Sequence, residues 1–179
     1  MGKYDYIQEL SQKYGIVKPV FLTETGFLCP STIDICNPVG DVFFQKQAEY
    51  STWLVLRNWA EGIALSFWYP YDGPGWRSSS IMTREQEPKP IYDALKIVMS
   101  EILASQGVRR IDNLPEGLLG YELSMPEKLV WVVTSQDNQA HALNLPDNLI
   151  QIRDVYGNVL PLPGDYLEVY QPVYIDLSP

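Results

Sequence analysis

The chain has 179 residues, of which 46% are hydrophobic, 20% are charged and 12% are aromatic, so it has the length and composition of a globular protein with a buried core. Its net charge of −9 argues against nucleic acids and anionic membranes as partners, because both attract clustered Lys and Arg. The sequence contains no apolar run of about 18 residues, so we expect no membrane-spanning helix.

The first 106 residues alternate between helical and strand-like patterns. Short apolar runs rich in β-forming residues, typical of buried parallel strands, occupy 18–25 and 63–69. Helical patterns precede, separate and follow them, at 3–14, 43–60 and 90–104. Strands that alternate with helices are joined by right-handed crossovers and lie parallel, so this part predicts an α/β layered or barrel architecture.

The pattern changes after Gly107. Short stretches of alternating polar and apolar residues follow one another, separated by turn sequences such as SQDN, PDN and YGN about every ten residues. This pattern is typical of an antiparallel β-sandwich. The sequence therefore predicts α/β plus all-β structure, with a partial barrel in residues 1–106 and a sandwich in residues 107–179.

The chain has two cysteines, Cys29 and Cys36, in the loop CPSTIDIC. Their spacing is compatible with a small disulfide ring and equally with two free thiols. A structural zinc site needs about four ligands, and His141 is far away in the sequence, so no metal site is expected. No cofactor is expected either.

A carboxylate follows the first predicted strand, in the sequence TETG at 23–26. The carboxyl ends of parallel strands are where α/β barrels build active sites, and an unpaired buried charge is costly, so Glu24 is a candidate catalytic residue. Taken alone, Glu24 is explained equally well by a salt bridge to an arginine in a loop.

Four segments resemble consecutive parts of glycoside hydrolase clan A, whose members are retaining (β/α)8-barrel glycosidases. They are KPVFLTETGF, GIALSFWYPYDGPGW, EPKPIYDALK and DVYGNVLPLPGDYLEVYQPVYIDL. Together they are similar to the last two βα units of the barrel and the sandwich that follows it. The resemblance implies that Glu24 is the catalytic nucleophile and that Trp68 forms the floor of the sugar subsite. It also implies that Tyr69 points away from that floor and that a carbohydrate is the substrate.

The loop after the second predicted strand would line the rim of the substrate cleft, through Tyr71, Asp72, Trp76 and Arg77. Retaining hydrolysis needs a second carboxyl group as acid/base, which in this clan follows an Asn. The sequence contains no Asn-Glu dipeptide and has no room for six earlier strands. Asp72 precedes Gly73 and fits a turn residue, and Glu61 ends a helix on the wrong side of the next strand, so neither replaces the acid.

We therefore expect a C-terminal portion of a retaining glycosidase that is inactive alone. The remainder of the barrel or a second copy of the chain would cover the open edges of its strands. The compartment stays open, although clan members are often exported and a disulfide would fit export.

Two other classes of protein remain as alternatives. In a carbohydrate-binding module, an exposed aromatic row on the sandwich would come from Tyr121, Tyr166, Tyr170 and Tyr174. In a structural module, the sandwich would only support the barrel. Among the tryptophans, we expect Trp53 and Trp59 to pack against the barrel wall and Trp131 to lie in the sandwich core.

Overall fold

The computed structural model describes residues 2–16, 18–30, 32–34, 36, 38–73, 76–164 and 166–179. The first part contains α1 (Gly2–Lys13), β1 (Phe21–Thr25), α2 (Asp41–Ala60), β2 (Leu65–Trp68), the short 3-10 turn η1 (Trp76–Ser78) and α3 (Pro90–Ala104). The second part contains β3 (Gly107–Arg110), β4 (Leu118–Ser124), β5 (Leu129–Ser135), β6 (His141–Asn144), β7 (Leu149–Arg153), β8 (Val159–Leu160), β9 (Tyr166–Val169) and β10 (Val173–Leu177).

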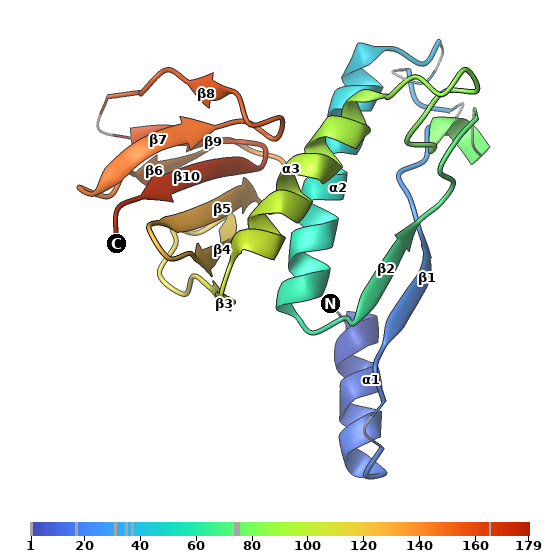
Figure 1. The fold of residues 1–179 in the computed structure, drawn as a ribbon, viewed down its shortest axis with the longest axis horizontal. Coiled ribbons are helices and arrows are strands. Elements are labelled where there is room, and N and C mark those ends of the chain that lie inside the picture. Colours follow the sequence, from blue (N-terminus) through green and yellow to red (C-terminus); the bar gives the residue numbers. More distant parts are fainter. Residues whose placement is uncertain are drawn as a thin grey trace.

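The first part is a parallel strand pair with helices on one side. Strands β1 and β2 pair in parallel, with Phe21 opposite Leu65 and Thr25 opposite Trp68, and the register shifts between Leu22 and Thr25. Helices α2 and α3 pack along each other between this pair and the second part, whereas α1 extends away from the rest of the molecule (Figure 1). These are two βα units, and within the described residues neither outer strand edge pairs with another strand.

Local sequence explains where the long helices begin and end. The acidic side chain of Asp41 lies in the first turn of α2, where it interacts favourably with the positive end of the helix dipole. Gly62 follows α2 with a φ of +83°, a conformation that other residues adopt at a cost. Pro90 occupies the first turn of α3, where its missing N–H leaves no hydrogen bond unmade.

The second part is antiparallel. Its larger sheet has the strand order β3-β4-β5-β10-β7-β8, and β6 and β9 form a second, two-stranded sheet. Apolar side chains between the two sheets form one core, with Leu118, Val133, Leu143, Ile152 and Ile175 among its buried members. The predicted fold, a partial barrel followed by an antiparallel sandwich, is confirmed.

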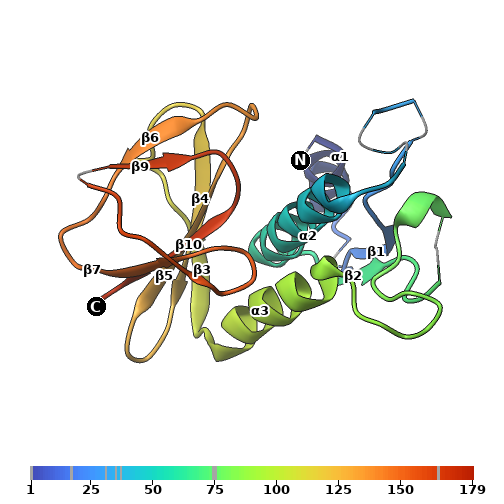
Figure 2. The same cartoon turned by 90° about the horizontal axis from the view of Figure 1, so that it is seen from above.

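The other face of the larger sheet packs on the helices, as Figure 2 shows from above. This second core joins Leu56 of α2 and Val98 of α3 to Tyr121, Leu123, Val130, Val132 and Tyr174 of the sheet. Glu61, at the end of α2, accepts a hydrogen bond of 2.7 Å from the Tyr121 hydroxyl. The partial barrel and the sandwich therefore share buried side chains across residue 106, and the division at that residue stays a prediction.

Two expectations about aromatic residues need correction. Trp53 packs on the Tyr121 ring of the sandwich, with centroids 5.4 Å apart, and not on the barrel strands, because its face of α2 is turned toward the larger sheet. Tyr121 and Tyr174 are 2% and 0% exposed beneath the helices, so they contribute to no exposed aromatic row. Among the described residues, no helix combines the length and apolar composition needed to cross a membrane.

Candidate active site at the carboxyl end of the parallel strands

Glu24 lies one residue before the end of β1 and its side chain is exposed. On the helix side of the strand pair, Thr25, Ser66 and Trp68 line a cavity of about 340 Å³. Asn58 of α2 donates a hydrogen bond of 3.0 Å to the Ser66 hydroxyl, which fixes that side of β2. Successive strand residues point to opposite faces, so Glu24 and Phe67 stand on the face turned away from the helices.

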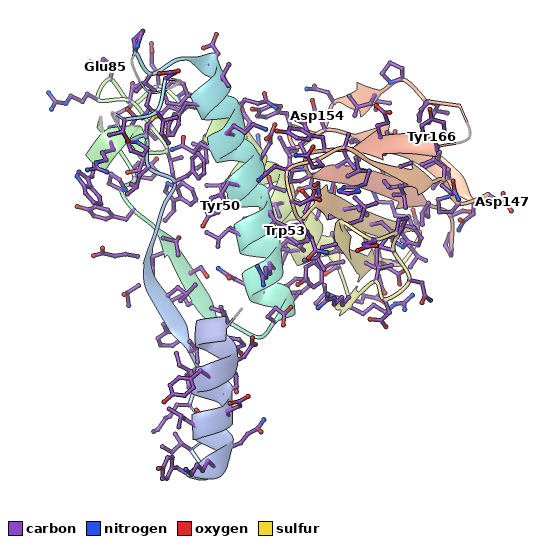
Figure 3. The ribbon with its side chains drawn as sticks, turned by 180° about the vertical axis from the view of Figure 1, so that it is seen from behind. Tyr50, Trp53, Glu85, Asp147, Asp154 and Tyr166 are labelled. Atoms are coloured by element: carbon purple, nitrogen blue, oxygen red, sulfur yellow. A yellow bond between two sulfur atoms is a disulfide. The ribbon has the colours of Figure 1, made fainter. Side chains whose placement is uncertain are left out.

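Trp68 lies on the helix side of β2. Its indole N–H donates a hydrogen bond of 2.7 Å to the Ser79 carbonyl, and its ring centroid is 6.4 Å from that of Tyr50 on α2. Figure 3 shows Tyr50 and Trp53 along α2. Trp68 is thus on the opposite face from Glu24, and its contact with sugar stays a prediction.

Tyr69 is the next residue and is 54% exposed. Its backbone N–H donates a hydrogen bond of 2.8 Å to the Thr25 carbonyl, which continues the parallel pairing beyond Trp68. The peptide bond between Tyr69 and Pro70 is cis. By alternation along the strand, Tyr69 lies on the Glu24 face, two residues after Phe67 and nearer to the carboxyl end of the sheet.

The four predicted rim residues, Tyr71, Asp72, Trp76 and Arg77, lie in the loop after β2, at the same end of the sheet as Glu24. The Tyr71 carbonyl accepts hydrogen bonds from two backbone N–H groups later in this loop, and the Tyr71 side chain is 58% exposed. Asp72 accepts a hydrogen bond of 3.1 Å from the Gln86 side chain, so its carboxylate links two separate parts of this loop. Trp76 is 61% exposed, with the Arg77 guanidinium 5.0 Å from its ring centroid.

The loop after β1 is tied to the loop after β2. A disulfide joins Cys29 and Cys36, whose Cα atoms are 5.3 Å apart. The Cys29 N–H donates to the Arg77 carbonyl at 2.9 Å. The buried side chain of Gln47 on α2 donates to the carbonyls of Phe27 and Ser78 at 3.4 and 3.2 Å. Sequence reasoning missed Gln47, which gives no distinct signal because Glu49, Ser51, Thr52 and Asn58 are also buried polar residues of α2.

Within the part of the chain that the structure describes, no hydrogen bond or ion pair joins a second carboxyl group to Glu24. The described residues also contain no group of three His, Cys, Asp or Glu side chains that could hold a metal ion. The chemistry that this end of the sheet offers is therefore that of the exposed Glu24 carboxylate beside aromatic side chains, with a second exposed carboxylate, Asp72, hydrogen-bonded to Gln86 in the loop after β2.

These elements define two parallel βα units of a partial barrel followed by an antiparallel sandwich. The structure is similar to that of a family 39 glycoside hydrolase from the gut symbiont Bacteroides cellulosilyticus WH2, with a TM-score of 0.70 and 17% identity over 97% of this chain. It is also similar to a conserved exported protein from Bacteroides fragilis, with a TM-score of 0.52 and 11% identity over 93% of this chain.

The chain spans 37% of the length of the first protein and 40% of the second. A family 30 subfamily 8 xylanase from Clostridium acetobutylicum aligns over 96% of this chain and 45% of its own, at 13% identity, and its TM-score of 0.49 is too low to add to the comparison. No protein-family model and no curated protein matches the sequence. The predicted resemblance to the C-terminal portion of a clan A glycosidase is confirmed at the level of the fold.

Proposed function

We propose that the chain is the C-terminal portion of a retaining glycoside hydrolase and that Glu24 is its nucleophile. The observation that carries this proposal is the position of Glu24. Its carboxylate is exposed at the carboxyl end of a parallel strand, on the face away from the helices, which is where (β/α)8 barrels build their active sites. The likeness to a family 39 glycoside hydrolase over nearly the whole chain supports a carbohydrate as the substrate.

In the proposed reaction, a Glu24 oxygen attacks the anomeric carbon of the sugar and the bond to the leaving oxygen breaks. A carboxylic acid from outside this chain protonates that oxygen. The same group then removes a proton from water, which attacks the anomeric carbon, releases the sugar and regenerates the Glu24 carboxylate. The two carboxyl groups must lie about 5–5.5 Å apart for this sequence of steps.

The open edges of the strand pair support a barrel that is completed by other strands. Phe21 and Phe67, which a closed barrel would bury, are 53% and 51% exposed. The cavity on the helix side of the strand pair is largely apolar. It lies between β2 and α3, and Leu95 and Met99 of α3 also line it. Strands from the remainder of a barrel, or from a second copy of the chain, would cover these backbone edges and apolar side chains.

Mechanism-based labelling tests the assignment in a protein whose barrel is complete. A 2-deoxy-2-fluoroglycosyl fluoride slows hydrolysis of the glycosyl-enzyme, so the nucleophile accumulates as a glycosyl ester. The proposal predicts that mass spectrometry finds the sugar on the peptide containing Glu24 and finds none after Glu24→Gln. Labelling of a different carboxylate would reject Glu24 as the nucleophile.

A further inference from the structure

A second cleft lies in the sandwich, on the side of the larger sheet that faces away from the helices. It has a volume of about 370 Å³, within the range of about 300–1,000 Å³ that is usual for small-molecule sites. Its floor comes from Arg109, Glu122 and Trp131. Its walls and rim come from the β3–β4 connection and from the end of β6, with the lining residues Ile111, Asp112, Asn113, Leu114, Pro115, Leu143 and Asn144.

Strand pairing explains the floor of this cleft. Arg109 on β3 lies opposite Glu122 on β4, and Glu122 lies opposite Trp131 on β5, so the three side chains form one row across three strands. Farther along the same face the β6–β9 pair covers the apolar core. The row lies near the β3 edge of the larger sheet. The smaller sheet does not cover the larger sheet there, so the space between the two sheets is open to solvent.

Hydrogen bonds join the three side chains of this row. Arg109 donates to the two Glu122 oxygens at 2.8 and 3.1 Å, and the Trp131 indole N–H donates to the same carboxylate at 2.8 Å. Burial alone would raise the pKa of the Glu122 carboxyl, but the hydrogen bonds from Arg109 and Trp131 outweigh it and lower that pKa. Glu122 therefore stays ionised and holds the guanidinium and the indole in place.

We propose that this cleft is a second, non-catalytic carbohydrate-binding site that takes one or two neutral pyranose units. Sugar rings combine apolar C–H faces with hydroxyl groups that both donate and accept hydrogen bonds. The cleft offers the same combination, with the Trp131 indole and apolar walls beside the Arg109 donors and the side-chain amides of Asn113 and Asn144.

The charge of the cleft selects among ligands. One guanidinium is set against the carboxylates of Glu122 and Asp112, so the lining is negative overall and disfavours phosphates and sugar acids. Neutral sugars do not meet this repulsion. The position of the cleft also separates it from the proposed active site, because the larger sheet lies between the cleft and the helices, and Glu24 lies beyond them.

Nuclear magnetic resonance of the full chain tests the site. The probes are xylose, glucose, galactose and mannose, together with β-1,4-linked xylotetraose and cellotetraose. Binding in the cleft predicts dose-dependent shifts of the Trp131 indole N–H signal and of the amide signals of residues 109–115 and 144, with at least one probe. If none of the probes moves these signals, the proposed site is rejected.

Two rim variants show whether any shift arises in the cleft. Asn113→Ala and Asn144→Ala remove exposed side chains and leave the Arg109–Glu122–Trp131 row intact, so the fold is retained. Each should weaken binding roughly three- to tenfold, the effect of one hydrogen bond. The control Asp147→Ala removes an exposed side chain outside the cleft, at the tip of the sandwich labelled in Figure 3, and should leave binding unchanged.

Glu24→Gln should bind the probes as tightly as the unchanged chain. The proposal of a sugar site in the sandwich is therefore tested independently of the proposed active site. If the Asn113→Ala and Asn144→Ala variants bind the sugar as tightly as the unchanged chain, the sugar binds elsewhere and the proposal is contradicted.

Discussion

Arg153 on β7 donates a hydrogen bond of 2.8 Å to Glu101 on α3, and both side chains are about nine-tenths buried where the sandwich meets the last helix. The same guanidinium donates to both oxygens of Asp176 on β10, at 2.9 and 2.6 Å. One cation thus joins a helix to two strands, and removing it would leave two buried carboxylates without their main partner.

The first prediction concerns this cation. Arg153→Met should lower the free energy of unfolding by about 3–5 kcal/mol, because it leaves buried charges uncompensated. Urea denaturation followed by circular dichroism measures the change. The matched control is Arg110→Met, at an exposed position on β3, where a change within about 0.5 kcal/mol is expected. Equal changes in the free energy of unfolding for the two substitutions would show that the buried network adds no more stability than an exposed arginine does.

The second prediction is a pH dependence. Burial acts to raise the pKa of Asp176, but hydrogen bonds from Arg153 and Gln151 outweigh it and lower that pKa below its usual value. A carboxyl whose pKa is lowered on folding stabilises the protein above its unfolded pKa of about 3.9, and this stability is lost as the pH falls through the folded pKa. The stability difference between the unchanged chain and Asp176→Asn should therefore be constant above about pH 5 and shrink below about pH 4. A difference that stays the same down to pH 2 would contradict this account.

The third prediction separates Trp68 from Tyr69. Trp68→Phe removes the hydrogen bond to Ser79 and should lower the free energy of unfolding by about 0.5–1.5 kcal/mol. Tyr69→Phe, at an exposed side chain, should change it by less than about 0.5 kcal/mol. Thermal and urea unfolding measure both. In a completed enzyme, a loss of turnover in Trp68→Ala that exceeds the loss in Tyr69→Ala would favour Trp68 as the sugar contact. The reverse order would favour Tyr69.

The fourth prediction tests the division after residue 106. Leu56 is fully buried between α2 and the sandwich, so Leu56→Ala should cost about 2–5 kcal/mol of stability. Because the core around Leu56 contains residues from both sides of the division, the two parts should unfold in one transition. Tryptophan fluorescence and far-ultraviolet circular dichroism should then give the same midpoint. Two separate midpoints would show that the parts fold independently.

The sequence predicted the elements whose patterns are strongly periodic. The helix expected at 90–104 has those bounds in the structure, and the strand expected at 63–69 contains β2 (Leu65–Trp68). The two short strands β3 (Gly107–Arg110) and β8 (Val159–Leu160) were missed, because the β3 sequence GVRR does not alternate between polar and apolar residues and β8 has only two residues.

The partners of individual side chains could not be predicted in the same way. The sequence indicates that Trp53 is buried on α2, but only tertiary structure decides that it packs on Tyr121 of the sandwich. Likewise, the row of Arg109, Glu122 and Trp131 depends on the register of three strands, which no local pattern records. The disulfide between Cys29 and Cys36, left open by their spacing, is present in the structure.

The most direct test of the central claim is hydrolysis of a panel of aryl glycosides by this chain, beside its Glu24→Gln variant. We predict no turnover by either protein, because one carboxylate cannot serve as both nucleophile and acid/base. Turnover by the unchanged chain that disappears in Glu24→Gln would confirm the nucleophile. It would also contradict the claim that the chain needs further barrel strands to form its active site.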